Sequence, residues 1–210
     1  GLKIVFFMNK PIRKINKPTM IIGHHTAVSR TKASRQFWAV HRYHYENPNM
    51  NLGYASTLGY FGAYYIFFEP DGTELRYRED WEEGAHTKGQ NLNSLAFCWA
   101  GDGDIEFPTD AQIVSIRKRI KEWQQKYNIP NERIFIVPHR KFAPKSCWGS
   151  LLADDWAYLL MNPPTKNPID AEKVKQIESF QKIIIDLMQQ IITQFKIKLN
   201  LQIRQKMPPQ

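Results

Sequence analysis

The proline-rich segment at residues 162–168 limits the folds open to this chain more than any other feature. It reads Asn-Pro-Pro-Thr-Lys-Asn-Pro. Because proline fixes φ and lacks a backbone N–H, neither a helix nor a central strand runs through such a segment. We therefore expect a linker at 163–168 that separates a domain at 1–162 from an appendage at 169–210. With 210 residues and 42% apolar content, the chain is large enough for one domain with a proper core.

Before the linker, short apolar runs alternate with segments of helical periodicity. Apolar runs that predict strands occur at 2–8, 19–23, 63–68, 73–78, 94–100 and 133–137. Helical spacing predicts helices at 34–45, 109–127 and 150–161. The second helix has a clear start, because Thr109 and Gln112 form a capping box. This alternation predicts an α/β fold with a central mixed β-sheet flanked by helices, to which residues 2–8 add an N-terminal strand.

After the linker, the apolar period changes once. Residues 170–194 carry an amphipathic helical stripe, whereas residues 195–204 alternate apolar and polar side chains, which is typical of a strand. The chain is therefore expected to end in a C-terminal helix-strand appendage. Three roles remain open for residues 169–210: packing on their own domain, forming a subunit interface, or contacting a wall or membrane.

The composition indicates a polyanionic partner, because 29 basic against 20 acidic residues give a formal net charge of +9. The basic residues are spread along the chain and no nucleic-acid motif occurs, so we expect no nucleic-acid partner. No stretch approaches the ~20 apolar residues of a transmembrane segment. The apolar run at 4–8 is also too short for a signal peptide. We therefore expect the protein to be made in the cytoplasm of the producing cell without a signal peptide of its own.

The stretch from His139 to Cys147 holds the side chains with the clearest chemistry. A histidine nitrogen and a cysteine sulfur are ligand types that Zn²⁺ prefers. Two ligands make a poor site, and the best source of a third is the pair His24-His25, at the end of an apolar run. Three protein ligands leave one tetrahedral position open, as in catalytic zinc sites.

Three other residues with ligand-type side chains have plainer interpretations. His41 and His44 lie at helical spacing, so we expect them to pack or to face solvent rather than to bind metal. Cys98 falls in an apolar strand with no second soft ligand beside it, so we expect a small buried side chain. The chain has two cysteines, and a metal-bound Cys147 excludes an intrachain disulfide, which favours folding in a reducing compartment.

Four separated motifs, in their order and spacing, resemble those of a known family. They are Ile-Gly-His-His-Thr-Ala at 22–27, Ala-Tyr-Tyr-Ile-Phe-Phe at 63–68 with Asp71-Gly72, Gly-Ala-His-Thr-Lys-Gly at 84–89 with Asn93-Ser94, and the run from His139 that ends in Ala-Pro-Lys-Ser-Cys at 147. Over roughly residues 12–161 the chain is similar to the zinc-dependent N-acetylmuramoyl-L-alanine amidases of phage endolysins and peptidoglycan recognition proteins. The segment beyond residue 164 has no counterpart in the compact phage enzymes.

The resemblance implies an active site around one zinc ion. The metal ligands would be His24, His139 and Cys147. The catalytic residues would be Tyr64 and Lys145, one to activate water and one to stabilise the oxyanion, with the assignment left open. The residues that contact substrate would be His86, Thr87 and Asn93, and His25 is interpreted as structural.

The resemblance also implies a function. The chain would be a peptidoglycan hydrolase that cleaves the amide bond between N-acetylmuramic acid and L-alanine, acting as a phage endolysin on the bacterial cell wall after release. One alternative is a cytosolic recycling amidase that acts on soluble anhydro-muropeptides. Another is a non-catalytic peptidoglycan-binding module, against which Cys147 argues because members that only bind usually lack this cysteine.

Overall fold

The computed structural model describes residues 11–31, 36–47, 49, 54–163 and 168–205. The chain divides into two compact units, residues 1–163 and 164–210. In chain order the first unit contains β1 (Met20–His25), α1 (Gln36–Glu46), β2 (Ile66–Phe68), β3 (Glu74–Arg76), β4 (Ser94–Trp99), α2 (Asp110–Tyr127), β5 (Ile136–Pro138), the 3₁₀ turn η1 (His139–Lys141) and α3 (Trp156–Met161). The expected N-terminal strand at 2–8 lies outside the described residues.

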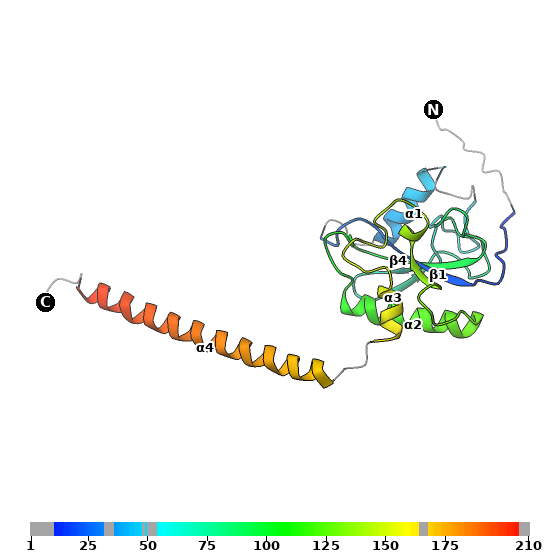
Figure 1. The fold of residues 1–210 in the computed structure, drawn as a ribbon. Coiled ribbons are helices and arrows are strands. Elements are labelled where there is room, and N and C mark those ends of the chain that lie inside the picture. The colour runs from blue at the N-terminus through cyan, green and yellow to red at the C-terminus, as the bar shows by residue number, and fades with distance from the viewer. Residues whose placement is uncertain (1–10, 32–35, 48, 50–53, 164–167, 206–210) are drawn as a thin grey trace, which may run out of the picture. The chain divides into compact units, whose positions relative to one another are not determined.

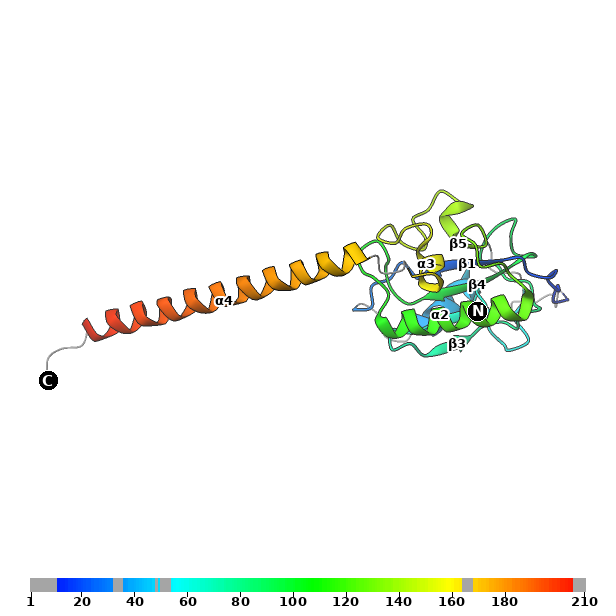
Figure 2. The ribbon, with the colours of Figure 1, turned by 60° about the horizontal axis from the view of Figure 1, so that its bottom comes forward.

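The five strands form one mixed sheet in the order β3-β2-β4-β1-β5. Strand β3 pairs with β2 in the antiparallel sense, and the other three pairings are parallel. The predicted mixed α/β sheet is therefore confirmed. The regular pairing of the runs at 63–68 and 133–137 begins only at Ile66 and Ile136, and the run at 73–78 pairs only over Glu74–Arg76, so these strands are shorter than predicted. Figure 2 shows β1, β4 and β5 next to one another in this sheet.

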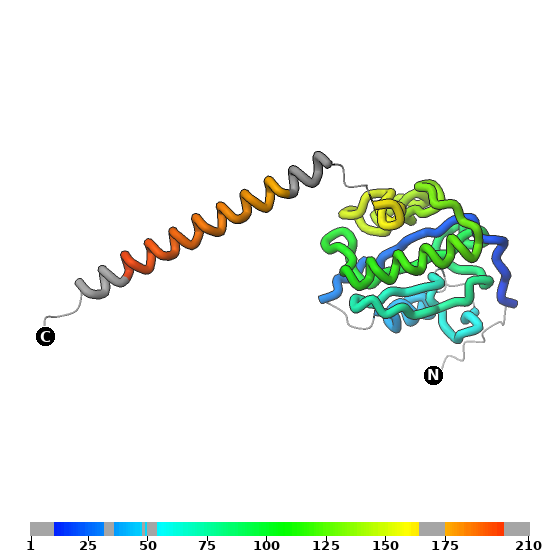
Figure 3. Tube along the Cα trace, turned by 90° about the horizontal axis from the view of Figure 1, so that it is seen from below, coloured from blue at the N-terminus to red at the C-terminus, as the bar shows by residue number. Residues whose placement is uncertain are grey.

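Helices cover both faces of the sheet (Figure 1). Ile66 and Phe68 pack in the cluster that contains Ile116 of α2, whereas Phe67 packs in the second cluster with Phe37 of α1. Successive residues of a strand point to opposite faces, so this alternation separates the α2 side from the α1 side. Figure 3, seen from below, shows α2 crossing one face with α3 beside it.

Helix α2 is fixed to the sheet at its start. The predicted capping box is present, because the Thr109 hydroxyl accepts from the Gln112 N–H while the Gln112 side chain accepts from the Thr109 N–H. The amide of Gln112 also donates to the carbonyls of Phe68 and Ala100, at the ends of β2 and β4. These bonds fix the first turn of α2 on the sheet. The buried apolar residues of the helix, Ile116, Ile120 and Trp123, follow after this turn.

The predicted helix at 150–161 is wrong in its first half, because α3 begins only at Trp156. The Ser150 N–H donates to the Asp104 carboxylate, and the Arg140 guanidinium donates to the carbonyls of Gly149 and Leu152. Backbone groups held in this way are not available for the regular bonds of a helix. Residues 150–155 therefore fold as turns rather than as the first half of a helix.

The described residues of the C-terminal unit form a single helix, α4 (Pro168–Gln205), and the predicted strand at 195–204 is wrong. Neither glycine nor proline interrupts residues 169–205, so no residue ends the helix where the apolar period changes. Phe195 and Leu199 follow Ile191 at intervals of four residues, so they continue the apolar stripe of the helix. Phe195 and Leu199 also fit the alternation of apolar and polar residues that predicted a strand. No helix in the described part of the chain is long and apolar enough to cross a membrane.

Candidate active site

His24 lies near the carboxyl end of β1, where the parallel register pairs it with Cys98 of β4. Paired residues of parallel strands point to the same face, and Cys98 belongs to the cluster on the α1 side. His24 therefore points to the α1 side, and His25 points to the other. There the Nδ1 atom of His25 accepts the Gly103 N–H at 2.8 Å, so His25 holds the loop after β4.

Gly23 allows Cys147 to approach His24. A Cβ atom at residue 23 would lie 2.4 Å from Cε3 of Trp148, which is too close for any side chain. The Trp148 ring, which has 0% exposure, therefore packs directly against the backbone of β1. Because Cys147 precedes this anchored ring, the thiol is held beside the end of β1.

Arg140 links the two other expected ligands. Its backbone N–H donates to the Cys147 carbonyl at 2.7 Å, and its guanidinium donates to the Gly149 carbonyl at 2.7 Å. The preceding residue, His139, begins η1 directly after β5. One arginine thus connects the end of β5 to the Cys147 loop, so His139 and Cys147 are positioned together.

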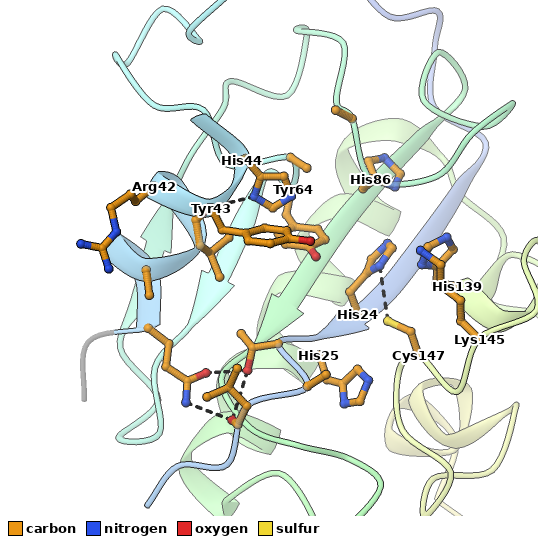
Figure 4. A pocket seen from close by; sticks show the side chains of 18 of the residues that line it. His24, His25, Arg42, Tyr43, His44, Tyr64, His86, His139, Lys145 and Cys147 are labelled. Atoms are coloured by element: carbon orange, nitrogen blue, oxygen red, sulfur yellow. Dashed lines mark hydrogen bonds between the residues drawn. The ribbon is translucent and has the colours of Figure 1, made fainter. Parts of the chain in front are cut away.

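The three expected metal ligands come together. Nδ1 of His24 lies 3.5 Å from Sγ of Cys147, and the ring centroids of His24 and His139 are 4.6 Å apart. One donor atom from each residue lies within 4.8 Å of the others. Tetrahedral bonds of about 2.0 Å to nitrogen and 2.3 Å to sulfur place those two atoms about 3.5 Å apart. The donor set and its spacing fit zinc (Figure 4).

Burial keeps these ligands neutral in the absence of a cation. It lowers the pKa of His24 well below 6.5, and nearby His86 and His139 lower it further. Burial and then Lys145 lower the pKa of His139 to about 4. Burial raises the pKa of the Cys147 thiol to about 12. Neutral imidazoles are ready to ligate a metal, while the thiolate form of Cys147 needs a cation beside it.

A cavity of about 640 Å³ opens over this cluster, and both expected catalytic residues line it. The Tyr64 ring centroid lies 4.9 Å from that of His24. Burial, then Cys98 and Cys147, raise the pKa of Tyr64 well above 10, so its hydroxyl stays protonated. The exposed Lys145 lines the same cavity. Neighbouring Tyr65 points away and donates to the Glu82 carbonyl at 2.7 Å.

His86 and Thr87 lie behind the metal ligands. The Thr87 hydroxyl is 3.5 Å from Nε2 of His24 and 3.0 Å from Nδ1 of His86. The other ring nitrogen of His86 is buried and has no hydrogen-bond partner within the described structure. His86 lines the cavity, whereas Thr87 does not. Thr87 is therefore placed to orient His24 rather than to touch a substrate.

The structure does not place Asn93 among the residues that line the cavity. Asn93 directly precedes β4 and its carbonyl accepts the Thr19 N–H, whereas the metal ligand His24 lies near the carboxyl end of β1. The Asn93 side chain instead accepts a hydrogen bond from Asn16 at 2.8 Å. The length of β4 separates this residue from the metal ligands.

Helix α1 forms a cavity wall that the sequence did not reveal. Arg42, Tyr43, His44 and Glu46 line the cavity from this helix. Helical spacing predicted α1 but could not indicate which side faces the ligands, because that depends on how the helix packs on the sheet. His44 stacks edge-on against Tyr64 at 5.7 Å, and His41 accepts the Phe61 N–H. Neither histidine belongs to the metal cluster of the described residues.

Comparisons with known proteins show which family the sequence and the fold resemble. The sequence profile described as N-acetylmuramoyl-L-alanine amidase matches residues 14–150. The endolysins of Escherichia phage T7 and Enterobacteria phage T3 are each 31% identical over 90 residues, which cover 40% of this chain and 57% of theirs. The matched region thus spans little more than half the length of these curated relatives.

Solved structures share the fold. The amidase LysC from Clostridium intestinale has a TM-score of 0.53 at 23% identity, over 67% of this chain and 82% of its own. Drosophila PGRP-LB has a TM-score of 0.56 at 19% identity, over 73% and 86%. The Ph2119 endolysin of a Thermus scotoductus bacteriophage has a TM-score of 0.56 at 14% identity, over 74% and 93%. Because the family profile covers more than half of the chain and includes all three clustered ligands, the chain belongs to the N-acetylmuramoyl-L-alanine amidase family.

Proposed function

We propose that this chain is a zinc-dependent amidase of bacterial peptidoglycan. It hydrolyses the amide bond between the lactyl group of N-acetylmuramic acid and the L-alanine of the stem peptide. The observation that carries this proposal is the 3.5 Å approach of His24 to Cys147, with His139 beside them in an open cavity. Two nitrogens and one sulfur form a set of three protein ligands, which is typical of catalytic zinc.

The chain's own side chains support amide hydrolysis at this place. When bound, zinc supplies Lewis acidity, which polarises a carbonyl and makes water nucleophilic at neutral pH. The Tyr64 hydroxyl, with its pKa raised well above 10, donates a hydrogen bond to the oxygen on which negative charge develops. Lys145 brings a positive charge to the same cavity. We therefore assign Tyr64 to the oxyanion, and we assign Lys145 to stabilising the anionic form of the attacking water through its charge.

The biological role proposed is that of an endolysin. The curated relatives that match the chain are endolysins of phages T7 and T3, and the phage Ph2119 endolysin shares its fold. In this role the protein is made in the cytoplasm of the infected cell and acts on the wall after release. The net charge of +9 favours approach to the wall polyanion, an attraction that added salt weakens.

Mass analysis of purified peptidoglycan after digestion tests this function directly. Free stem peptides that begin with L-alanine are expected, lost when a chelator removes the metal and restored by zinc. Cut glycan strands, or binding to the wall without any product, would refute the amidase assignment. Parallel digestion of soluble anhydro-muropeptides separates an endolysin from a recycling amidase, because only the recycling enzyme prefers the soluble substrate.

A further inference from the structure

The apolar face of α4 is not explained by the amidase site. Six apolar side chains recur there at spacings of three and four residues: Ile177, Phe180, Ile184, Leu187, Ile191 and Phe195. We call them the α4 stripe. Each has more than half of its surface exposed. The described residues of the C-terminal unit form this one helix, so the unit itself offers no second element to cover the stripe (Figure 1).

The α4 stripe alone has the spacing of a coiled-coil seam, but the apolar face of α4 is wider than the stripe. With the neighbouring Ile185, Met188, Ile192 and Leu199 it covers about 160° of the helix circumference, at about 100° per residue. A coiled-coil seam uses two positions in seven and is narrower. A broad apolar face of this kind fits a flat apolar surface better than it fits one partner helix.

Lys198 also argues against a helix–helix seam. It lies three residues after Phe195 and eighteen after Phe180, which places it inside the stripe at about 100° per residue. In a tight seam its ammonium group would be buried. At a lipid surface the apolar stem packs along the stripe while the ammonium reaches the headgroups.

The charge of the helix changes along its length. Over 168–210 the four acidic residues are Asp170, Glu172, Glu178 and Asp186. From residue 187 to its end at Gln205 the helix contains three basic residues and no acidic one: Lys196, Lys198 and Arg204. This half therefore joins an apolar stripe to uncompensated positive charge, which complements an anionic lipid surface.

We propose that α4 binds the surface of an anionic lipid bilayer. The helix lies in the plane of the interface, with the α4 stripe at the boundary between headgroups and acyl chains and with Lys196 and Lys198 against the headgroups. It is not expected to span, since no described helix is long and apolar enough to cross a membrane. The inference does not depend on the amidase function, because it rests on the residues of α4 alone.

Vesicle co-sedimentation of the full chain tests the proposal. One set of vesicles contains equal parts of phosphatidylglycerol and phosphatidylcholine, and the other contains phosphatidylcholine alone. We expect at least tenfold tighter binding to the anionic vesicles. Replacing both lysines, Lys196→Gln with Lys198→Gln, lowers that affinity by more than tenfold, because each cation near an anionic surface contributes about fivefold.

A matched pair of variants tests the stripe separately from the charge. Ile191→Asp places a carboxylate in the stripe, whereas Thr193→Asp places the same charge on the opposite, polar face two residues later. Ile191→Asp is expected to weaken binding to anionic vesicles at least tenfold more than Thr193→Asp does. Circular dichroism checks whether both variants keep their helix content, and digestion of purified peptidoglycan checks whether the first unit is folded.

Three results would overturn the proposal. They are equal binding to both kinds of vesicle, equal loss in the two aspartate variants, and no vesicle binding at all. Sedimentation equilibrium on the same proteins tests the alternative that a second copy of the chain covers the α4 stripe. A dimer that Ile191→Asp dissociates and that does not bind vesicles would assign the stripe to a second copy of the chain.

Discussion

Sγ of Cys147 lies 3.5 Å from Nδ1 of His24, although 123 residues separate them in the sequence. If the two atoms share a zinc ion, Cys147→Ser should remove the soft ligand and weaken the site. We expect the purified variant to hold less than a tenth of the zinc of the unchanged protein and to lose peptidoglycan hydrolysis about 100-fold or more. Metal analysis and the release of stem peptides measure both effects.

Cys98 provides the control for this substitution. It lies opposite His24 in the sheet and is fully buried, but no metal ligand set includes it among the described residues. Cys98→Ala should therefore lower thermal stability and leave zinc content unchanged. Full zinc occupancy in Cys147→Ser, together with normal hydrolysis, would exclude Cys147 as a ligand of a catalytic zinc ion.

Tyr64 and Tyr65 form a natural pair for testing the oxyanion donor. Tyr64→Phe removes only the hydroxyl of a residue that lines the cavity, so it should lower kcat about 10²–10³-fold while zinc content stays the same. Tyr65→Phe removes the hydrogen bond to the Glu82 carbonyl and should cost about 1 kcal/mol of stability, with kcat nearly unchanged. Reversed effects in the two variants would exclude Tyr64 from the reaction.

Comparing variants of Lys145 and Lys141 distinguishes a role in the reaction from an effect of net charge on the approach to the wall. Both side chains are exposed, but only Lys145 lines the cavity. Lys145→Gln should lower kcat about 100-fold. Lys141→Gln, which removes the same charge from η1, should affect only the approach to the wall and its salt dependence. Equal losses at low salt that disappear at high salt would show that Lys145 acts through net charge alone.

Local patterns predicted most of the fold because they depend on neighbouring residues. Strands β1 and β4 are short apolar runs, and the start of α2 is set by the capping box of Thr109 and Gln112. The same dependence on neighbouring residues explains why the strand predicted at 195–204 is wrong. Alternation at 195–204 fits a strand locally, but a strand needs a neighbour, and the uninterrupted helix α4 needs none.

The site was predictable only in its residue types. The sequence supplied histidine, cysteine, tyrosine and lysine in family-like motifs, but their approach depends on distant contacts. Gly23 must lack a side chain for Trp148 to pack, and Arg140 must bond the Cys147 loop. The wall from α1 and the remote position of Asn93 follow from the packing and direction of elements. No local pattern encodes either.

His86 gives a prediction about pH and stability. Burial, with smaller effects from His139 and Arg78, lowers its pKa from 6.5 to about 3. Between these two values the unfolded chain binds a proton that the folded protein does not bind. The contribution of His86 to stability is therefore present above pH 6.5 and is lost as the pH falls toward 3. For this one group the loss on going from about pH 8 to about pH 5 is about 2 kcal/mol.

Urea unfolding of the metal-free protein at these two pH values measures the effect. His86→Asn should reduce the pH-dependent loss in the free energy of unfolding by about 2 kcal/mol, whatever its effect on absolute stability. His41→Asn should reduce it less, because His41 is less buried and its pKa is lowered by burial without neighbouring charges. An unchanged pH dependence in His86→Asn would mean that this imidazole is accessible to protons in the folded state.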